Sequence, residues 1–557
     1  MTDVAVLGGG IGGLTAAHEL AEREVDVTVY EANDRFGGKA RSMPISDEPA
    51  PLHGEHGFRF FPAFYRHVID TMERIPDGDG TVADNLVETE ATLIANTTGP
   101  GQIAETRTPD SVRGWLEALR PAFAEDLPAR DVRFLLERLF YLLTACEARR
   151  EEELDDISWW EFIDAENRSP ALRDRLAFAV QSLVALRPQV GSARTIGTVY
   201  LQLLFGQLDP TRPTERVLNA PTSAAWIDPW LRHLESLGVE FRPNAPVRRL
   251  ETDGRRITGA TLADGETIAA DEYVLAVPVE VAPKLIPTEL ARNAPALERI
   301  DRLDTAWMNG IQFYLADDVD LTRGHQVYAD APWALTSISQ RQFWTGYDLE
   351  EHGPEAVEGV LSVIVSDWDT PGIVYGKPAR ECTPEEIATE IWEQLKHHLN
   401  GPDQRLRDEH LVDWFLDPAI VETSVASETQ REDGETVDEG GVENRSPLLI
   451  NTVGSLRNRP PADVVVENLT VAGDYVRTNA DLASMESANE AGRRAANAVL
   501  ERRGSRGSQA RIWPLAEPAV FEPFKRQDRV RYRLGLPHPG AVTQSIRGVT
   551  RRFGGRV

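Results

Sequence analysis

The chain has 557 residues, of which 41% are apolar, and a chain of this length normally forms two or three domains rather than one small binding module. No apolar run approaches the roughly 18 residues that a membrane-spanning helix needs, and Cys146 and Cys382 stand too far apart for a zinc motif or a disulfide framework. The formal net charge of −30 disfavours a nucleic-acid partner, because phosphate binding needs clustered positive charge.

Lysine is scarce among the basic residues. An excess of carboxylates keeps a protein surface hydrated in concentrated salt, so we expect a halophilic source. The chain begins directly with a strand-like pattern and shows neither a basic leader nor a cleavage site, and we therefore expect a cytoplasmic protein. Of the 59 basic side chains only five are lysines, namely Lys39, Lys284, Lys377, Lys396 and Lys525.

The first thirty residues carry a complete strand–helix–strand pattern. An apolar run at 4–7 is followed by glycines, a helical pattern and a second apolar run at 25–30. Glycines allow a close backbone approach to a pyrophosphate, the helix N-terminus offers free N–H groups, and a carboxylate after the second strand can accept a ribose hydroxyl. The pattern predicts a dinucleotide site made by Gly8, Gly10, Ile11, Gly12, Gly13, Glu31 and Ala32.

The residues that follow favour one dinucleotide over the others. A carboxylate at Glu31 would repel a 2′-phosphate, which leaves FAD or NAD. The segment 34–42, with Gly37 and Gly38 at its centre, resembles the glycine-doublet motif of the flavin amine oxidase and phytoene desaturase superfamily. This resemblance implies FAD as the cofactor and places Lys39 and Arg41 near its diphosphate or its flavin.

A stretch rich in aromatic residues follows at 54–65, with the sequence GEHGFRFFPAFY. It resembles the stretch that borders the isoalloxazine ring and the substrate tunnel in this superfamily. Packed aromatic residues of this kind more often belong to a core than to a binding site. The resemblance nevertheless makes His56, Arg59 and Tyr65 second-tier candidates for catalysis.

A strand meander over 238–278 resembles the part of the superfamily's FAD site that contacts the adenine, with the backbone of Val247 at the contact. Near the C-terminus, a buried strand ends in Gly473 and Asp474, and an alanine-rich helix opens shortly afterwards. This pair of segments resembles a signature of the plant and cyanobacterial carotenoid desaturases. The resemblance implies that Asp474 binds the ribityl or diphosphate part of FAD.

The helix that opens at 482–488, with the sequence LASMESA, completes this signature, although Ser487 stands where the desaturases have glycine. By the resemblance, Met485, Glu486 and Ala488 lie at the pyrimidine edge of the flavin, where free N–H groups stabilise negative charge. Glu486 has two interpretations. It is either a catalytic group or an acid that stabilises the helix dipole.

The segments together predict an α/β protein. A Rossmann-type FAD-binding domain, with a parallel sheet, helices and a β-meander, carries an inserted α+β substrate domain. Leucine and alanine at helical spacing and alternating apolar strands form the insert. The predicted ranges are 1–70, 215–290 and 445–500 for the FAD-binding domain, 71–214 and 291–444 for the substrate domain, and 501–557 for a basic C-terminal extension.

The apolar character of the predicted insert favours a flavin desaturase. We expect it to act on a long apolar isoprenoid, either a carotenoid precursor or a squalene-like lipid, with a quinone or oxygen as the electron acceptor. The segments 221–228 and 331–339 loosely resemble a bacterial branch described as hydroxysqualene dehydroxylase-like, which supports a lipid-like substrate. Beyond the candidates already named, the catalytic residues stay open.

Two other functions remain as alternatives. A flavin amine oxidase generally places a lysine near the flavin, but the corresponding stretch at 305–312 has none and Lys284 comes too early. A lipid carrier that binds FAD without turnover is the second alternative. No histidine, cysteine or carboxylate spacing indicates a metal site.

The C-terminal extension reverses the charge of the chain. Residues 502–557 contain 13 basic and 3 acidic side chains, a net charge of about +10. Because the whole chain carries −30, the residues before this extension carry about −40. Such asymmetry is typical of a segment with an anionic partner, either a membrane surface or the acidic body of the protein itself. A simply solvated tail is the remaining interpretation.

Overall fold

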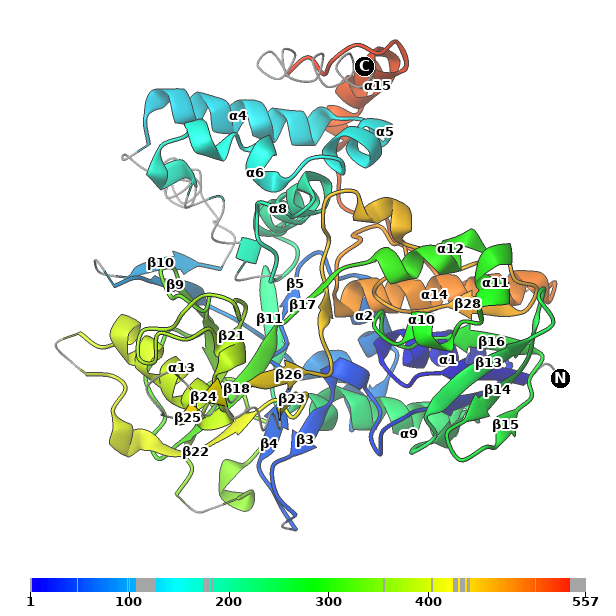
Figure 1. The fold of residues 1–557 in the computed structure, drawn as a ribbon, viewed down its shortest axis with the longest axis horizontal. Coiled ribbons are helices and arrows are strands. Elements are labelled where there is room, and N and C mark those ends of the chain that lie inside the picture. The colour runs from blue at the N-terminus through cyan, green and yellow to red at the C-terminus, as the bar shows by residue number, and fades with distance from the viewer. Residues whose placement is uncertain are drawn as a thin grey trace.

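The computed structural model describes residues 3–540 with some exceptions, and Figure 1 shows three regions. A parallel sheet lies at the right of the view, a second sheet at the lower left, and a group of helices at the top. The residues that are not described are 1–2, 48, 98, 100, 107–126, 174–175, 177–179, 182–184, 354–355, 402–403, 424–428, 431–435, 438–440, 506 and 541–557.

The first region is a five-stranded sheet in which every neighbouring pair is parallel. Its central strands are buried on both faces, as is usual for parallel sheets with covered faces. In the order in which they pair, the strands are β12 (Glu240–Arg242), β2 (Asp26–Tyr30), β1 (Asp3–Leu7), β16 (Glu272–Leu275) and β28 (Leu469–Val471).

Two long helices from opposite ends of the chain cross on this sheet (Figure 1). They are α1 (Ile11–Ala21) and α14 (Met485–Arg502). A Cβ atom at Gly492 would lie 2.4 Å from the carbonyl oxygen of Gly12, so only glycine permits this approach. The crossing therefore brings the N-terminal glycine motif and the C-terminal helix into direct backbone contact.

The other elements near this sheet are short. The predicted meander is an antiparallel sheet of β13 (Val247–Thr252), β14 (Ile257–Leu262) and β15 (Thr267–Ile268). Of the short helices, α2 (His67–Glu73) packs against α14, α9 (Asp228–Ser236) against α1 and α10 (Ala282–Leu285) against β13. Helices α11 (Thr288–Asn293) and α12 (Pro295–Glu298) pack together, and β3 (Ser42–Pro44) pairs with β4 (His53–Glu55).

The second region is a seven-stranded sheet, covered by helix α13 (Pro384–Leu399). Trp392 of this helix packs against Phe313 of the sheet, with 5.2 Å between the ring centroids. The strands pair in the order β10 (Gln102–Glu105), β9 (Ala91–Ala95), β19 (His325–Tyr328), β20 (Thr336–Ser339), β21 (Gly359–Val365), β18 (Asn309–Leu315) and β22 (Leu411–Leu416).

The third region is helical and packs around Tyr141 and Phe162. Part of the leucine-rich stretch predicted to be helical, at 107–126, lies outside the described residues. The described helices of this region are α4 (Ala129–Thr144), α5 (Glu147–Arg149), α6 (Trp159–Phe162) and α8 (Ala193–Leu208), joined by the C-terminal α15 (Glu522–Arg533).

All strands of the parallel sheet fall within the ranges predicted for the FAD-binding domain, and all strands of the seven-stranded sheet fall within those predicted for the substrate domain. A small sheet of β5 (Phe61–Pro62), β11 (Glu215–Leu218) and β8 (Leu86–Glu88) crosses this division. The boundaries themselves stay a prediction. Within the described part of the chain, no helix combines the length and the apolar character that crossing a membrane requires.

Candidate functional site

A cavity of about 920 Å³ lies where the three regions meet. Its first wall lies at the C-terminal ends of three parallel strands, where Gly8, Ala276 and Ala472 line it. This edge is where ligands bind in open parallel sheets. The opposite walls come from α8 and the seven-stranded sheet.

The glycine motif forms the turn between β1 and α1. Gly8 has φ +115°, a backbone conformation that residues with a side chain rarely adopt. Gly10 precedes the helix and provides no side-chain cap. The first N–H groups of α1 therefore remain available for a ligand, and Ile11 and Gly12 line the cavity beside them. Gly13 has a packing role instead, because a Cβ there would lie 1.9 Å from the Gly8 carbonyl oxygen.

Glu31 is fixed before any ligand arrives. One carboxylate oxygen accepts a hydrogen bond from the Gly9 N–H at 2.8 Å, and the other accepts from the Asn33 N–H at 3.0 Å. The side chain is buried yet lines the cavity together with Ala32 and Val247. The three residues predicted for the adenosine half thus lie on one wall.

The glycine doublet lies against the first glycine motif. The Gly37 N–H donates to the Gly9 carbonyl at 2.8 Å, and Gly37 itself has φ +104°. A Cβ at Gly38 would lie 3.0 Å from the Gly10 Cα, so the two loops touch. Arg41 donates to the Gly38 carbonyl at 2.9 Å and lines the cavity.

Lys39 faces two carboxylates on the cavity wall. Its ammonium lies 3.3 Å from Glu280, and it also hydrogen-bonds the carbonyl of Pro447. Burial raises the pKa of both Glu280 and Asp474, against the opposing charge of Lys39. Asp474 and Gly473 line the cavity as predicted, whereas Glu280 was not a sequence candidate, because nothing around it in the chain marks it.

The position of the Glu486 side chain at the start of α14 decides whether it can be a catalytic group. Met485 and Ala488 line the cavity, but Glu486 does not. Its carboxylate accepts hydrogen bonds from the backbone N–H groups of Arg66 and His67, at 2.8 and 2.9 Å, and a third from Val68 at 3.0 Å. Glu486 therefore caps helix α2 from outside the cavity lining, a position that does not suit a catalytic group.

His56 makes a polar contact on the cavity wall that the sequence did not reveal. Its Nδ1 contacts the carboxylate of Asp417, which also accepts a hydrogen bond from Asn309 at 2.6 Å. Burial would raise the pKa of Asp417, but His56 and Asn309 together hold it below its usual value. The ring is thereby oriented, and its Nε2 has no hydrogen-bond partner among the described residues.

A second histidine pair lies on the same cavity wall. Nδ1 of His325 is 2.6 Å from the Glu215 carboxylate, and the ring packs between Phe58 and Phe60 at 5.0 and 5.2 Å. Arg59, from the same stretch, hydrogen-bonds the Gly57 carbonyl at 2.6 Å and that of Lys39. Burial raises the pKa of the other candidate, Tyr65, which lines the cavity as a neutral phenol.

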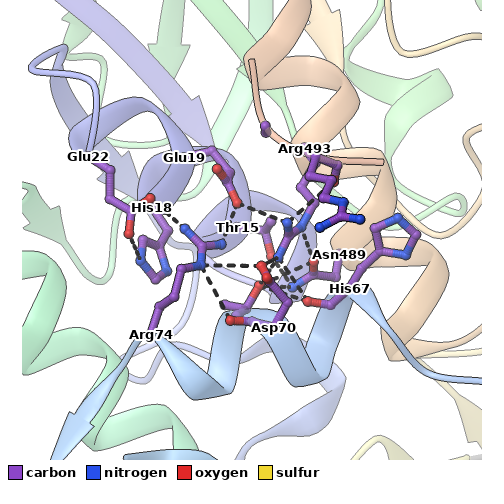
Figure 2. Close-up of polar contacts among 12 residues, drawn as sticks. Thr15, His18, Glu19, Glu22, His67, Asp70, Arg74, Asn489 and Arg493 are labelled. Atoms are coloured by element: carbon purple, nitrogen blue, oxygen red, sulfur yellow. Dashed lines mark hydrogen bonds and ion pairs between the residues drawn. The ribbon is translucent and has the colours of Figure 1, made fainter. Parts of the chain in front are cut away.

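Outside the cavity lining, a network of charged side chains joins α1, α2 and α14 (Figure 2). Glu19, with a side chain only 1% exposed, pairs with Arg74 and with Arg493, the latter at 3.4 Å. Arg493 also pairs with Asp70 at 2.7 Å. Each member of this buried network would be left unpaired if the helices moved apart. The network therefore holds α1 and α14, the helices whose N-termini line the cavity, in place beside α2.

Beside this network, the ligand atoms of His18, Glu22 and His233 lie within 4.8 Å of one another. His18 already uses both ring nitrogens: Nδ1 accepts from the Trp230 indole and Nε2 contacts Glu22, each at 3.1 Å. A metal ion would have to break one of these hydrogen bonds. The cluster therefore supports no metal site, and it lies outside the cavity lining.

Two glycine loops and two helix N-termini that meet at the edge of a parallel sheet are the features of a dinucleotide-binding protein. The chain belongs to the family described as flavin containing amine oxidoreductase, which matches residues 11–500. The predicted superfamily, the FAD cofactor and the α/β fold are confirmed. A halophilic source stays a prediction.

The chain is similar to curated proteins along most of its length. It is 28% identical to carotenoid phi-ring synthase of Streptomyces griseus over 92% of this chain and 90% of that protein. It is 24% identical to 15-cis-phytoene desaturase of Synechococcus elongatus over 92% of this chain and 99% of that protein. Both similarities extend beyond the cofactor motifs.

Solved structures share the fold at lower identity. Wild-type putrescine oxidase bound to putrescine superimposes with a TM-score of 0.58 at 16% identity, covering 90% of this chain and 99% of that one. An oxidoreductase from Methanosarcina mazei gives a TM-score of 0.56 at 13% identity, and the match covers 90% of this chain and 100% of that one. These likenesses establish the fold and no more.

The residues of the cavity wall fit FAD. The glycine loops have no room for a Cβ atom at several positions, so their backbone can approach a diphosphate closely. The diphosphate can bind the free N–H groups of α1, and the fixed Glu31 suits the adenosine ribose. At the start of α14 the Ser484 hydroxyl accepts the Ser487 N–H, which leaves the N–H groups of Met485 and Glu486 to suit the flavin. Bound FAD supplies the redox chemistry, so this protein is an FAD-dependent oxidoreductase.

Proposed function

We propose that this enzyme dehydrogenates a long apolar isoprenoid of the carotenoid type, with FAD as the hydride acceptor. The observation that carries this proposal is the apolar lining of the cavity beyond the cofactor motifs. Side chains from all three regions form it, and they line the same cavity as the glycine motifs. The apolar lining includes Leu186, Val199, Leu203, Met308, Val327 and Ile364.

In this proposal the protein positions the substrate and excludes water, and it makes few strong polar contacts with the substrate. A hydrocarbon offers no charged or hydrogen-bonding group, so a fitted apolar wall must hold the reacting carbon and exclude water. The pairs His56–Asp417 and His325–Glu215 are places in this wall where a proton can be held. We assign His56 as the group that takes the proton released from the substrate, with Asp417 as its positioning residue.

Amine oxidation is less well supported by the cavity. Of the five lysines, only Lys39 lines it, and Lys39 is already paired with Glu280. Met308 occupies the wall within the stretch where the amine oxidases are expected to carry their lysine. The names of the two curated relatives given above also favour a carotenoid over an amine.

The test is anaerobic bleaching of the bound flavin. We expect carotenoid precursors in detergent or lipid to bleach it, and simple amines such as putrescine to leave it yellow. Bleaching by amines alone would establish the amine oxidase alternative. Bleaching by neither, in protein that binds the isoprenoid, would favour the lipid carrier without turnover.

The electron acceptor is a separate part of the proposal. We propose a quinone or oxygen, because the reduced cofactor must be reoxidised and apolar quinones can enter an apolar cavity. Chemically reduced enzyme should regain its flavin absorbance on mixing with a short-chain quinone or with air. The two rates, measured by stopped flow, would rank the acceptors, and failure of both would reject them.

A further inference from the structure

The basic C-terminal extension is attached to the body of the protein through residues 509–540. Asn497 of α14 makes two hydrogen bonds with Ala510, at 2.6 and 2.8 Å. The N–H of Trp513 donates to His67 at 2.9 Å. A free, solvated tail is therefore the wrong interpretation for these residues, whereas 541–557 lie outside the described part.

Helix α15 is held by one side only. Asp528 pairs with Arg149 at 3.0 Å, and each of these side chains is 1% exposed. The same carboxylate accepts the Cys146 N–H at 2.9 Å, and Lys525 pairs with Glu517. These contacts fix the rotation of the helix, so its other side must face outwards.

The outward side carries an apolar stripe. Val530 and Leu534 are four residues apart and therefore lie on the same side, where they are 58% and 68% exposed. Phe524 in the first turn is 44% exposed, and Val520, just before the helix, is 67% exposed. Leu536 continues the stripe at 44%. Large side chains gathered in this way on a surface normally mark an interaction site, whereas scattered ones need no explanation.

The stripe extends onto the neighbouring helix α4. The Phe140 ring packs edge-on against Phe524, with 5.8 Å between the centroids, and is itself 38% exposed. Leu136, one turn away on α4, is 48% exposed. We call this surface of α15 and α4 the top face, after its place in Figure 1.

Three arginines run beside the stripe. Arg526, Arg529 and Arg533 are exposed, and none of them makes an ion pair with the residues that the structure describes. At helical spacing they fall together on the flank of α15 next to the apolar residues. The top face is thus basic on a chain whose net charge is −30.

We propose that the top face docks on an anionic lipid bilayer. An amphipathic helix with an apolar stripe and flanking arginines lies in the plane of a membrane interface, with the stripe among the acyl chains and the cations at the headgroups. A second copy of the chain fits less well, because a two-fold interface would place the same arginines against each other. The acidic remainder would face away from the anionic surface.

This orientation has a geometric consequence for the cavity. Helix α8, which contributes Val199 and Leu203 to the cavity, packs against α4 below the top face (Figure 1). Docking would therefore place only the helical region between the bilayer and the apolar cavity. The proposal does not depend on which reaction the cavity performs.

Vesicle flotation of the full-length, FAD-loaded protein tests the proposal. We expect binding to phosphatidylglycerol-containing vesicles, and weaker binding to vesicles of phosphatidylcholine alone. The double variant Val530→Ser, Leu534→Ser should reduce partitioning by roughly tenfold or more, because it removes apolar carbons from the buried stripe. The matched control Ile373→Ser, Val374→Ser changes side chains that are 48% and 47% exposed elsewhere and should bind normally.

Salt separates the two contributions. The triple variant Arg526→Gln, Arg529→Gln, Arg533→Gln should lose binding at low ionic strength, by roughly tenfold or more. In molar salt, where the Debye length is about 3 Å, it should match the unchanged protein. The control Arg248→Gln, Arg255→Gln, Arg256→Gln removes the same charge from exposed positions on and beside the meander and should bind normally.

Three outcomes would overturn the proposal. The first is no flotation of the unchanged protein with anionic vesicles. The second is equal binding by the top-face variants and their controls. The third is a stable dimer in the absence of lipid, measured by light scattering, that the top-face variants dissociate, because that would assign this face to a second copy. Flavin absorbance and thermal melting of each variant establish that it is folded.

Discussion

The two ends of the cavity are built by different means. At the FAD-binding end, the wall is built around the backbone of two glycine loops and two helix N-termini, which lie within short, recognisable motifs. At the substrate end, side chains from α8, the seven-stranded sheet and its connections form the wall. A site made of backbone tolerates little substitution, whereas a site made of side chains can be reshaped residue by residue. This difference explains why one family can keep a cofactor and change its substrates.

The sharpest way to break this comparison is to put a side chain into the backbone-built end. Gly12→Val should abolish FAD binding and cost several kcal/mol of folding free energy, because a Cβ there would lie 2.2 Å from the Ala472 carbonyl oxygen. Gly401→Ala is the control, since no residue that the structure describes lies within 4 Å of a Cβ at that position. The flavin-to-protein ratio and the melting temperature measure both effects. A yellow, stable Gly12→Val protein would contradict the prediction.

The next largest effect concerns the histidine pair between the two ends. His56→Ala should slow flavin reduction by the isoprenoid by about 100-fold, the usual contribution of a proton-transferring group, while FAD stays bound. Asp417→Asn should have a smaller effect and should shift the pH profile of the rate, because it only positions His56. His352→Ala, which alters a histidine outside the cavity lining, should leave the rate unchanged. Equal rates in all three variants would remove His56 from the reaction.

At the substrate end, enlarging one side chain should affect substrate use alone. Leu203→Trp would narrow the apolar cavity and lower kcat/KM by about tenfold, since a misfit in an apolar pocket costs about 1–3 kcal/mol. Leu208→Trp places the same bulk on the same helix at a side chain that is 41% exposed and should be silent. FAD content should be normal in both. Loss of FAD from Leu203→Trp would show that the two ends are not independent.

The smallest expected effect lies away from both ends, at Glu22. Burial would raise its pKa, but the hydrogen bond from His18 and the charges of Arg74 and Arg23 lower it to about 2. Because the folded-state pKa is depressed, the ionised carboxylate stabilises the fold above its ordinary pKa of 4.5, and this contribution is lost as the pH falls towards 2.

Glu22→Gln should therefore lower the free energy of unfolding by about 1 kcal/mol at pH 7, a figure reduced for its partial exposure. Denaturant unfolding at several pH values measures the difference between variant and parent. That difference should shrink below pH 4.5. A difference that stays constant over this range would mean that packing, and not charge, holds Glu22 in place.

Sequence reasoning succeeded where the chain itself carries the geometry. The segment from Asp3 to Glu31 forms one continuous strand–turn–helix–strand unit, so residue spacing translates directly into positions around the cofactor. The Gly37–Gly38 doublet and Asp474 were predicted for the same reason. Each lies within a few residues of the end of a strand of the parallel sheet, β2 or β28, so its place in the sequence fixes its place at the sheet edge. The structure places these predicted residues on the cavity wall, with the exception of Gly13, which packs against the Gly8 carbonyl.

It failed where distant segments meet. Asp417 and Glu280 each lie more than two hundred residues from the partner that gives them a role, His56 and Lys39, and no local pattern marks them. Glu486 was ambiguous for the same reason, since only the fold shows that the N-terminus of α2 receives its carboxylate. The basic extension was recognised by charge, but its attachment to α14 and to the helices depends on tertiary contacts.

The place of β28 in the parallel sheet has a consequence for biogenesis. This strand pairs with β16, and α14 crosses α1, yet Leu469 emerges from the ribosome long after Leu7. The N-terminal strand–helix–strand unit must therefore wait, with apolar surface uncovered, until nearly the whole chain has been synthesised. We therefore expect that the dinucleotide binds stably only after β28 and α14 have joined the N-terminal unit.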